Sequence, residues 1–156
     1  MARSVGNHLP DALQRLFDGT QPEEQVGFTI LLATVTNHGW PHLAMLSVGE
    51  LVAVDPREIR LALWPASSAA ANLGQGGKLT LACVHNAAAY SIRCRAVRTA
   101  SEFETLAVFK ARVDEVFEDV APYAVLEYGV GYHLTDVAQT LERWKRVIAH
   151  LKTALL

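Results

Sequence analysis

Short apolar runs separated by turn signals fill most of the sequence from residue 28 to residue 99, and this pattern restricts the fold more than any other feature. Turns are marked by Asn37-His38-Gly39 and Asp55-Pro56-Arg57-Glu58, because Asn, Gly and Pro favour tight backbone bends. Between turns, the run Ile59–Trp64 places Ile59, Leu61 and Leu63 on one face, as a half-buried strand does. We therefore expect strands at residues 28–36, 42–48, 51–54, 59–64, 78–85, 90–99 and 125–134.

Four helices are expected around these strands, at residues 11–17, 67–73, 101–117 and 139–155. The third begins with Ser101 and Glu104 at the spacing of a capping box, and the fourth carries an apolar stripe at helical spacing. Strands and helices do not alternate strictly, which excludes a parallel α/β sheet. The pattern predicts a mainly β (α+β) antiparallel barrel flanked by helices. We expect a single domain over residues 1–156, with a barrel core at about 26–134, an N-terminal helix at 11–18 and a C-terminal helix at 139–155.

Charge and composition restrict the partners of this chain. The formal net charge of −2 over 156 residues provides no overall attraction to nucleic acid. No apolar run reaches the ~18 residues that a membrane span requires, and Met1–Pro10 lacks the apolar stretch of a signal peptide. Cys83 and Cys94 are too few for a secreted disulfide framework and are expected to be buried free thiols. We therefore expect a cytoplasmic protein with neither a nucleic-acid nor a membrane partner.

The segment Ser67-Ser68-Ala69-Ala70-Ala71-Asn72-Leu73 follows an expected strand and opens like a short helix. Free backbone N–H groups and the positive end of the helix dipole can receive a phosphate at such a helix start. The alternative interpretation is an ordinary serine N-cap, which stabilises a helix by ~1 kcal/mol. Phosphate binding and simple capping both remain open on the residues alone.

Two histidines near the first turn invite comparison with a metal site. His38 and His42 are four residues apart, the spacing that would place them on one face of a helix. Here the turn residues Gly39-Trp40-Pro41 lie between them, and no Cys or carboxylate nearby completes a ligand set. No metal site is expected.

Several motifs occur in order between Phe28 and Arg98: the strand entry Gly39-Trp40-Pro41-His42, then Leu46-Ser47 before a hairpin, and Ile59–Trp64 followed by Ser67-Ser68 and Asn72-Leu73. The strand pair that begins at Lys78 and Tyr90 comes next. Together these residues resemble the pyridoxamine 5′-phosphate oxidase-like proteins, the FMN-binding split-barrel group. The resemblance implies a six-stranded antiparallel split barrel with Greek-key character. It also implies a homodimer that holds FMN between its subunits.

The resemblance further implies which residues contact the cofactor. The phosphate would lie where Ser67, Ser68 and Ala69 stand, although relatives often carry Lys or Arg at the position of Ala69. Other cations, among them Lys78 of a second subunit, would then supply the missing charge. On the residues themselves, Trp64 would border the flavin ring or fill the barrel end, and the hydroxyls of Tyr90 and Tyr132 would face a cleft or the core. The expected cofactor-binding residues are His42, Met45, Leu46, Ser47, Leu63, Trp64, Ser67, Ser68, Asn72, Lys78, Arg93 and Arg95.

Two functions follow from this interpretation. The first is an FMN-dependent oxidoreductase acting on a small molecule, for which no catalytic residue is assigned because the flavin ring performs the electron transfer. The second is a non-catalytic split-barrel binding protein with an altered cofactor site, which Ala69 favours. A third interpretation is an interaction protein that binds a partner through the helix at 139–155. FMN, a deazaflavin and haem all remain open as cofactors, and the substrate and electron donor are not specified.

Overall fold

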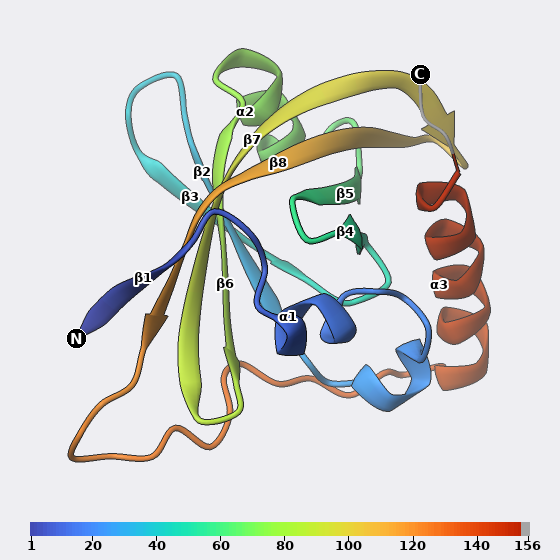
Figure 1. Cartoon of the computed structure of the whole chain (residues 1–156). Coiled ribbons are helices and arrows are strands. Elements are labelled where there is room, and N and C mark those ends of the chain that lie inside the picture. The colour runs from blue at the N-terminus through green and yellow to red at the C-terminus, as the bar shows by residue number, and fades with distance from the viewer. Residues whose placement is uncertain (154–156) are drawn as a thin grey trace.

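One continuous antiparallel sheet forms the body of the computed structural model, which describes residues 1–153 (Figure 1). Its strands follow the order β3-β2-β6-β7-β8-β5-β4, and β1 pairs with the end of β8. The strands are β1 (Ala2–Gly6), β2 (Ile30–Val35), β3 (Pro41–Leu46), β4 (Leu51–Asp55), β5 (Glu58–Leu63), β6 (Lys78–His85), β7 (Ala88–Phe103) and β8 (Leu106–Asp119). The helices are α1 (Asp11–Leu16), α2 (Ser68–Gln75), α3 (Val137–Leu151) and the short 3-10 helix η1 (Pro22–Gln25).

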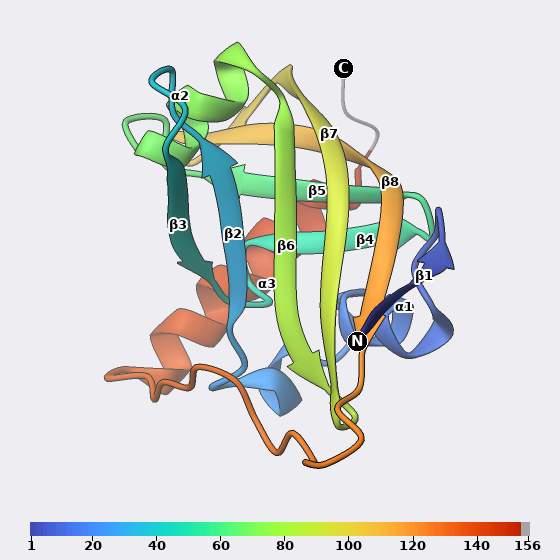
Figure 2. The ribbon, with the colours of Figure 1, turned by 90° about the vertical axis from the view of Figure 1, so that its left-hand side faces the viewer.

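The two longest strands, β7 and β8, bend the sheet into a barrel. Residues 107–112 of β8 pair with β5, whereas residues 116–119 pair with β1. The register of the β7–β8 ladder shifts at Arg93/Cys94 and again at Arg98/Glu102, and such bulges increase the local bend and twist. Figure 2 shows the result: β3, β2, β6, β7 and β8 lie side by side, and β5 and β4 cross behind them. The sheet ends at β3 on one side and at β4 on the other, so the barrel is split.

Helices cover the openings of the barrel. The inner face is lined by alternate side chains of the strands, such as Ile30, Leu32 and Phe109, which are fully buried. Helix α1 lies at one end and α2 at the opposite end, while α3 packs against β4 and β5 (Figures 1 and 2). No helix among residues 1–153 is long and apolar enough to cross a bilayer.

The expected fold class, a mainly β split barrel flanked by helices, is confirmed. Strands β2 to β7 lie at the six positions expected between residues 28 and 99, with small differences at their ends. Pairing of strands that are not consecutive, β2 with β6 and β5 with β8, agrees with the expected Greek-key character. The described residues contain eight strands rather than six, because β1 and β8 also join the sheet.

The helix expected at residues 101–117 is wrong. That segment contains the end of β7, a two-residue turn at Glu104 and Thr105, and most of β8. Both turn residues have positive φ, which is uncommon without Gly or Asn, so the usual sequence signal of a hairpin is missing. In β8 the buried residues Ala111 and Val113 alternate with exposed Arg112 and Asp114. Pairing with β5 and β7 therefore outweighs the local helix propensity.

The strand expected at residues 125–134 is also wrong, because this segment has no regular secondary structure and pairs with no strand. It alternates aromatic and branched residues, but Tyr128 is 80% exposed. Helix α3 begins at Val137 rather than at residue 139 and ends at Leu151, and the last expected helical residues, 154 and 155, lie outside the described residues. No strand was expected at Ala2–Gly6, where β1 has few apolar side chains.

Candidate functional site

Strand β3 forms one edge of the split and carries His42 on its inner face. His42 is the cross-strand partner of Thr34 on β2, so the two side chains lie on the same face of the sheet. Asn72 of α2 donates a hydrogen bond from Nδ2 to Thr34 Oγ1 at 3.0 Å, which places α2 over this face. Nδ1 of His42 is buried and forms no hydrogen bond within residues 1–153. An unpaired polar atom is thus left under α2, where burial without a partner is costly.

The start of α2 carries the two serines. Ser67 is the N-cap, and its Oγ accepts a hydrogen bond from the Ala70 N–H at 3.1 Å. Ser68 is exposed, whereas Ala69 is buried against the barrel. The N–H groups of Ser68 and Ala69 belong to the first helical turn and have no intrahelical acceptor. Ser67 therefore acts as a cap, and these two N–H groups remain as donors at the helix start.

The turn after β3 holds Ser47 in a network of its own. The Ser47 N–H and Oγ–H both donate to the Glu50 carboxylate, and Oγ accepts from the Gly49 N–H at 3.2 Å. The ring of Trp144 on α3 packs directly on Gly49. A cavity of about 320 Å³ opens beside this turn and is bounded by β3, by residues 130–134 and by α3. Met45, Leu46 and Ser47 line it together with Glu50, Tyr132 and Arg143.

Three expected site residues, Lys78, Arg93 and Arg95, line another cavity of about 500 Å³ on the outer face of β2, β6 and β7. Arg95 is the cross-strand partner of Lys78 and forms an ion pair with Asp114 at 2.6 Å. The guanidinium of Arg93 lies 4.6 Å from the centre of the Phe117 ring. These cations face away from the barrel interior, while His42 and α2 lie on the inner face.

The expected site residues thus fall into three groups within one chain: His42, Ser67, Ser68 and Asn72 around α2; Met45, Leu46 and Ser47 beside the β3–β4 turn; and the three cations on the outer face. Trp64 is 58% exposed after β5, and the Arg143 guanidinium lies 5.9 Å from its ring centre. Leu63 and Leu46 are buried, so they present mainly backbone to a ligand. Asn72 has a structural role, because its amide ties α2 to β2.

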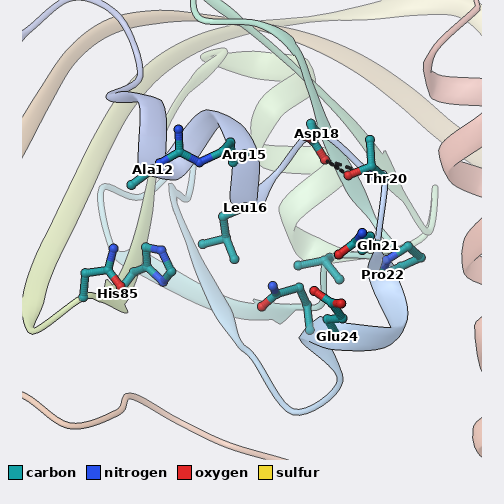
Figure 3. Close-up of a pocket in the computed structure, with 13 residues that line it drawn as sticks. Ala12, Arg15, Leu16, Asp18, Thr20, Gln21, Pro22, Glu24 and His85 are labelled. Atoms are coloured by element: carbon teal, nitrogen blue, oxygen red, sulfur yellow. Dashed lines mark hydrogen bonds between the residues drawn. The ribbon is translucent and has the colours of Figure 1, made fainter.

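Another cavity, of about 410 Å³, is lined by residues of α1 and of the segment after it (Figure 3), at the end of the barrel opposite α2 (Figure 1). Arg15, Asp18, Glu24 and His85 are among its lining residues, and Asp18 accepts hydrogen bonds from the N–H and hydroxyl of Thr20. Burial lowers the pKa of His85. None of the expected cofactor-binding residues lines this cavity.

Sequence reasoning missed Glu50 and Arg143, which join the cavity beside the β3–β4 turn. Glu50 lies three residues after Ser47, and a serine followed by a glutamate at this spacing is the signal that could have indicated their contact. Arg143 lies off the apolar stripe of α3 and gives no such signal, because only the packing of α3 against the turn brings it near β3.

No protein-family profile matches the chain. YclD, an uncharacterized protein of Bacillus subtilis strain 168, is 35% identical to it over 150 residues, which cover 94% of this chain and 97% of YclD. Similarity at this level over nearly the full length of both proteins indicates common ancestry.

Solved structures share the fold at lower identity. A candidate pyridoxamine 5′-phosphate oxidase from Lactobacillus delbrueckii is 21% identical, with a TM-score of 0.58 over 74% of this chain and 98% of that one. An FMN-binding protein from Syntrophomonas wolfei is 14% identical, with a TM-score of 0.52 over 75% of this chain and 90% of that one. The chain therefore has the split-barrel fold of the pyridoxamine 5′-phosphate oxidase-like proteins.

Proposed function

The chain belongs to the family of Bacillus subtilis YclD, and on this premise we propose that it is an FMN-binding flavoprotein, an oxidoreductase acting on a small molecule. One of the solved structures that share its fold is an FMN-binding protein. The observation that carries the proposal is the buried Nδ1 of His42, which forms no hydrogen bond within residues 1–153. A phosphate at the start of α2 would provide the missing partner.

The geometry around α2 supports this position. Asn72 is anchored to Thr34, the cross-strand partner of His42, and Ser68 lies four residues earlier on the same helix. Four residues of α-helix span about 6 Å, so the start of α2 lies about one helical turn from the point where the helix contacts the face that carries His42. The donors available there are the Ser68 hydroxyl, the N–H groups of the first turn and the His42 ring.

The donors around α2 carry little formal charge, whereas an FMN phosphate carries nearly two negative charges. The family resemblance implies a cation at the position of Ala69, which here is an uncharged and buried residue. We assign the missing charge to Lys78, Arg93 or Arg95 of a second subunit, because these residues face outward. The outer face of β3 beside them exposes Leu43 (65%) and Met45 (68%), as expected of a surface that a second copy covers. The proposed assembly is therefore a homodimer with FMN between its subunits.

When bound, FMN supplies an isoalloxazine ring that accepts and donates electrons. The chain itself orients that ring. The free edge of β3 offers backbone N–H and C=O groups, and Met45 and Trp64 present exposed apolar surfaces on the two sides of the split. Met45 and Trp64 would shield one side of a bound ring from water.

The test is a fluorescence titration of FMN with purified protein, together with the Ser67→Ala/Ser68→Ala variant. Loss of hydrogen bonds to a charged phosphate should weaken FMN binding by ~1–3 kcal/mol, or roughly 5- to 150-fold. Asp18→Ala is the matched control, since it also removes side-chain hydrogen bonds to backbone but lies at the far end of the barrel. Light scattering on the same samples should give twice the mass of one chain.

Each result has a defined meaning. No FMN affinity at micromolar concentration rejects the flavoprotein, and equal affinity in the double serine variant places the phosphate elsewhere. The second candidate function is a binding protein without catalysis, which buried Ala69 and the Ser47–Glu50 bond favour because both remove groups that could hold FMN. Steady oxidation of a nicotinamide donor in the presence of FMN would exclude that alternative.

A further inference from the structure

The cavity of about 320 Å³ beside the β3–β4 turn has features that FMN binding around α2 does not use. Its volume lies at the low end for ligand sites, so it suits a small molecule. Met45, Val130 and Leu134 provide an apolar wall, and polar groups come from Glu50, Tyr132 and Arg143. Because Met45 is also an expected flavin contact, the cavity adjoins the proposed FMN site.

Tyr132 lines this cavity and is its one phenol among the described residues. Its Oη is buried and meets no hydrogen-bond geometry within residues 1–153, although the Gly27 backbone and the Ser47 side chain lie near it. Burial raises the pKa of the Tyr132 phenol and the nearby Glu50 carboxylate adds to the effect, while Gly27 and Ser47 partly oppose it. The phenol therefore stays protonated and can donate a hydrogen bond to a ligand oxygen.

Arg143 places a positive charge beside this cavity and forms no ion pair among the described residues. Its guanidinium lies over the Trp64 ring, 5.9 Å from the ring centre. The acidic residues near α3 are already engaged, since Arg146 pairs with both Glu104 and Glu142. The planar guanidinium presents N–H groups at its edge, in the geometry that a carboxylate accepts.

Glu50 limits the charge of the ligand. Its carboxylate accepts hydrogen bonds from the Ser47 N–H and hydroxyl, which hold it in the cavity wall. With one cation and one fixed anion, the cavity favours a ligand with a single negative charge over a phosphate dianion, because a second negative charge would face Glu50 without compensation. The apolar wall favours an apolar body next to that charge.

We infer that this cavity binds a small organic monocarboxylate with an apolar body, held by Arg143 and Tyr132 through its carboxylate. The inference rests on the proposed function in one respect: the shared wall at Met45 makes this ligand the substrate that approaches FMN. Binding of a carboxylate in this cavity does not require that FMN is bound.

The test is a titration of the flavin-free protein and of the FMN-loaded protein with benzoate, followed by tryptophan fluorescence. Trp144 lines the cavity and Trp64 contacts Arg143, so binding should change the emission. Benzoate should saturate the signal. Benzyl alcohol, which is similar in shape but neutral, should bind at least about tenfold more weakly, and inorganic phosphate should not compete.

Arg143→Gln should weaken benzoate binding by roughly tenfold or more, Arg143→Lys should retain part of the affinity, and Tyr132→Phe should cost about three- to tenfold. Lys145→Gln is the matched control, because it removes an exposed positive charge from the same helix outside the cavity, and it should bind as the wild type does.

Absence of saturable benzoate binding, equal binding of benzyl alcohol, or wild-type affinity in Arg143→Gln would overturn the inference. Should Arg143→Gln fail to fold, the Tyr132→Phe and Arg143→Lys variants decide in the same way. Benzoate binding by a protein with no FMN affinity would reject the proposed flavoprotein function and support the carboxylate site. FMN binding without benzoate binding would reject only the site.

Discussion

Gly49 in the β3–β4 turn is the position where one added methyl group should do most damage. A Cβ at this residue would lie well under 3.0 Å from the ring atoms Cγ and Cδ1 of Trp144. Trp144 is only 3% exposed, so its ring can leave the core only at the cost of truncating a tryptophan, about 3–5 kcal/mol. Shifting the turn or the ring to accept the methyl group costs about 1–3 kcal/mol. Because shifting the turn or the ring costs less than expelling the ring from the core, Gly49→Ala should lose about 1–3 kcal/mol of stability.

Urea unfolding at a fixed protein concentration, followed by circular dichroism, measures this loss. With a slope of about 2 kcal/mol per molar urea, a loss of about 2 kcal/mol lowers the midpoint by roughly 1 M. Gly74→Ala is the matched control, since Gly74 lies in α2 with no atom near the position of an added Cβ. There the same substitution should stabilise the protein by up to about 1 kcal/mol, because alanine favours a helix.

A double-mutant cycle with Trp144→Phe identifies the cause. The smaller ring makes room for the methyl group, so the two substitutions together should cost at least ~1 kcal/mol less than the sum of their separate effects. Strict additivity of the two losses in unfolding free energy would refute the conclusion that Trp144 packs where a side chain at residue 49 would lie. An unchanged urea midpoint for Gly49→Ala would refute it as well.

Two further predictions concern titratable groups. Burial raises the pKa of the Cys83 and Cys94 thiols to about 12, so native protein at pH 8 should resist iodoacetamide until it is unfolded in urea, and rapid labelling of native protein would contradict this. Hydrogen bonds from Arg3 and Tyr90 hold the pKa of Glu118 below its ordinary value of 4.5, so its contribution to stability is present above that pH and is lost as pH falls through the lower folded value. Glu118→Gln should therefore be less stable than wild type near pH 7, with a difference in thermal midpoint that shrinks below about pH 4; a difference that is constant with pH would show that the charge is not responsible.

Local pattern predicted the parts of this protein that depend on near neighbours in the chain. Alternation along Ile59–Trp64 and the turn at Asp55-Pro56 identified β5 and the hairpin before it. The start of α2 was also predicted, because a serine cap and a run of alanines act within one helical turn. Ser101–Phe117 was misread as a helix, since its helical spacing satisfies a local rule that the pairing of β8 with β5 and β7 overrides.

The composition of the candidate site was less predictable, because distant segments create it. Ser47 was predicted to contact the cofactor, but in the folded chain its hydroxyl forms hydrogen bonds with the Glu50 carboxylate and the Gly49 N–H. Arg143 lies almost a hundred residues after Met45 in the sequence. The packing of the Trp144 ring on Gly49 is what brings Arg143 to the cavity that Met45 also lines.

The sequence by itself determined the antiparallel class, most strand positions and the serine-capped helix, since side-chain alternation, turn preference and capping act over a few residues. Tertiary structure alone decided which polar groups remain unpaired. Within residues 1–153 the buried His42 Nδ1 forms no hydrogen bond, because packing removed it from water without placing another group opposite, and that outcome depends on every element that surrounds it.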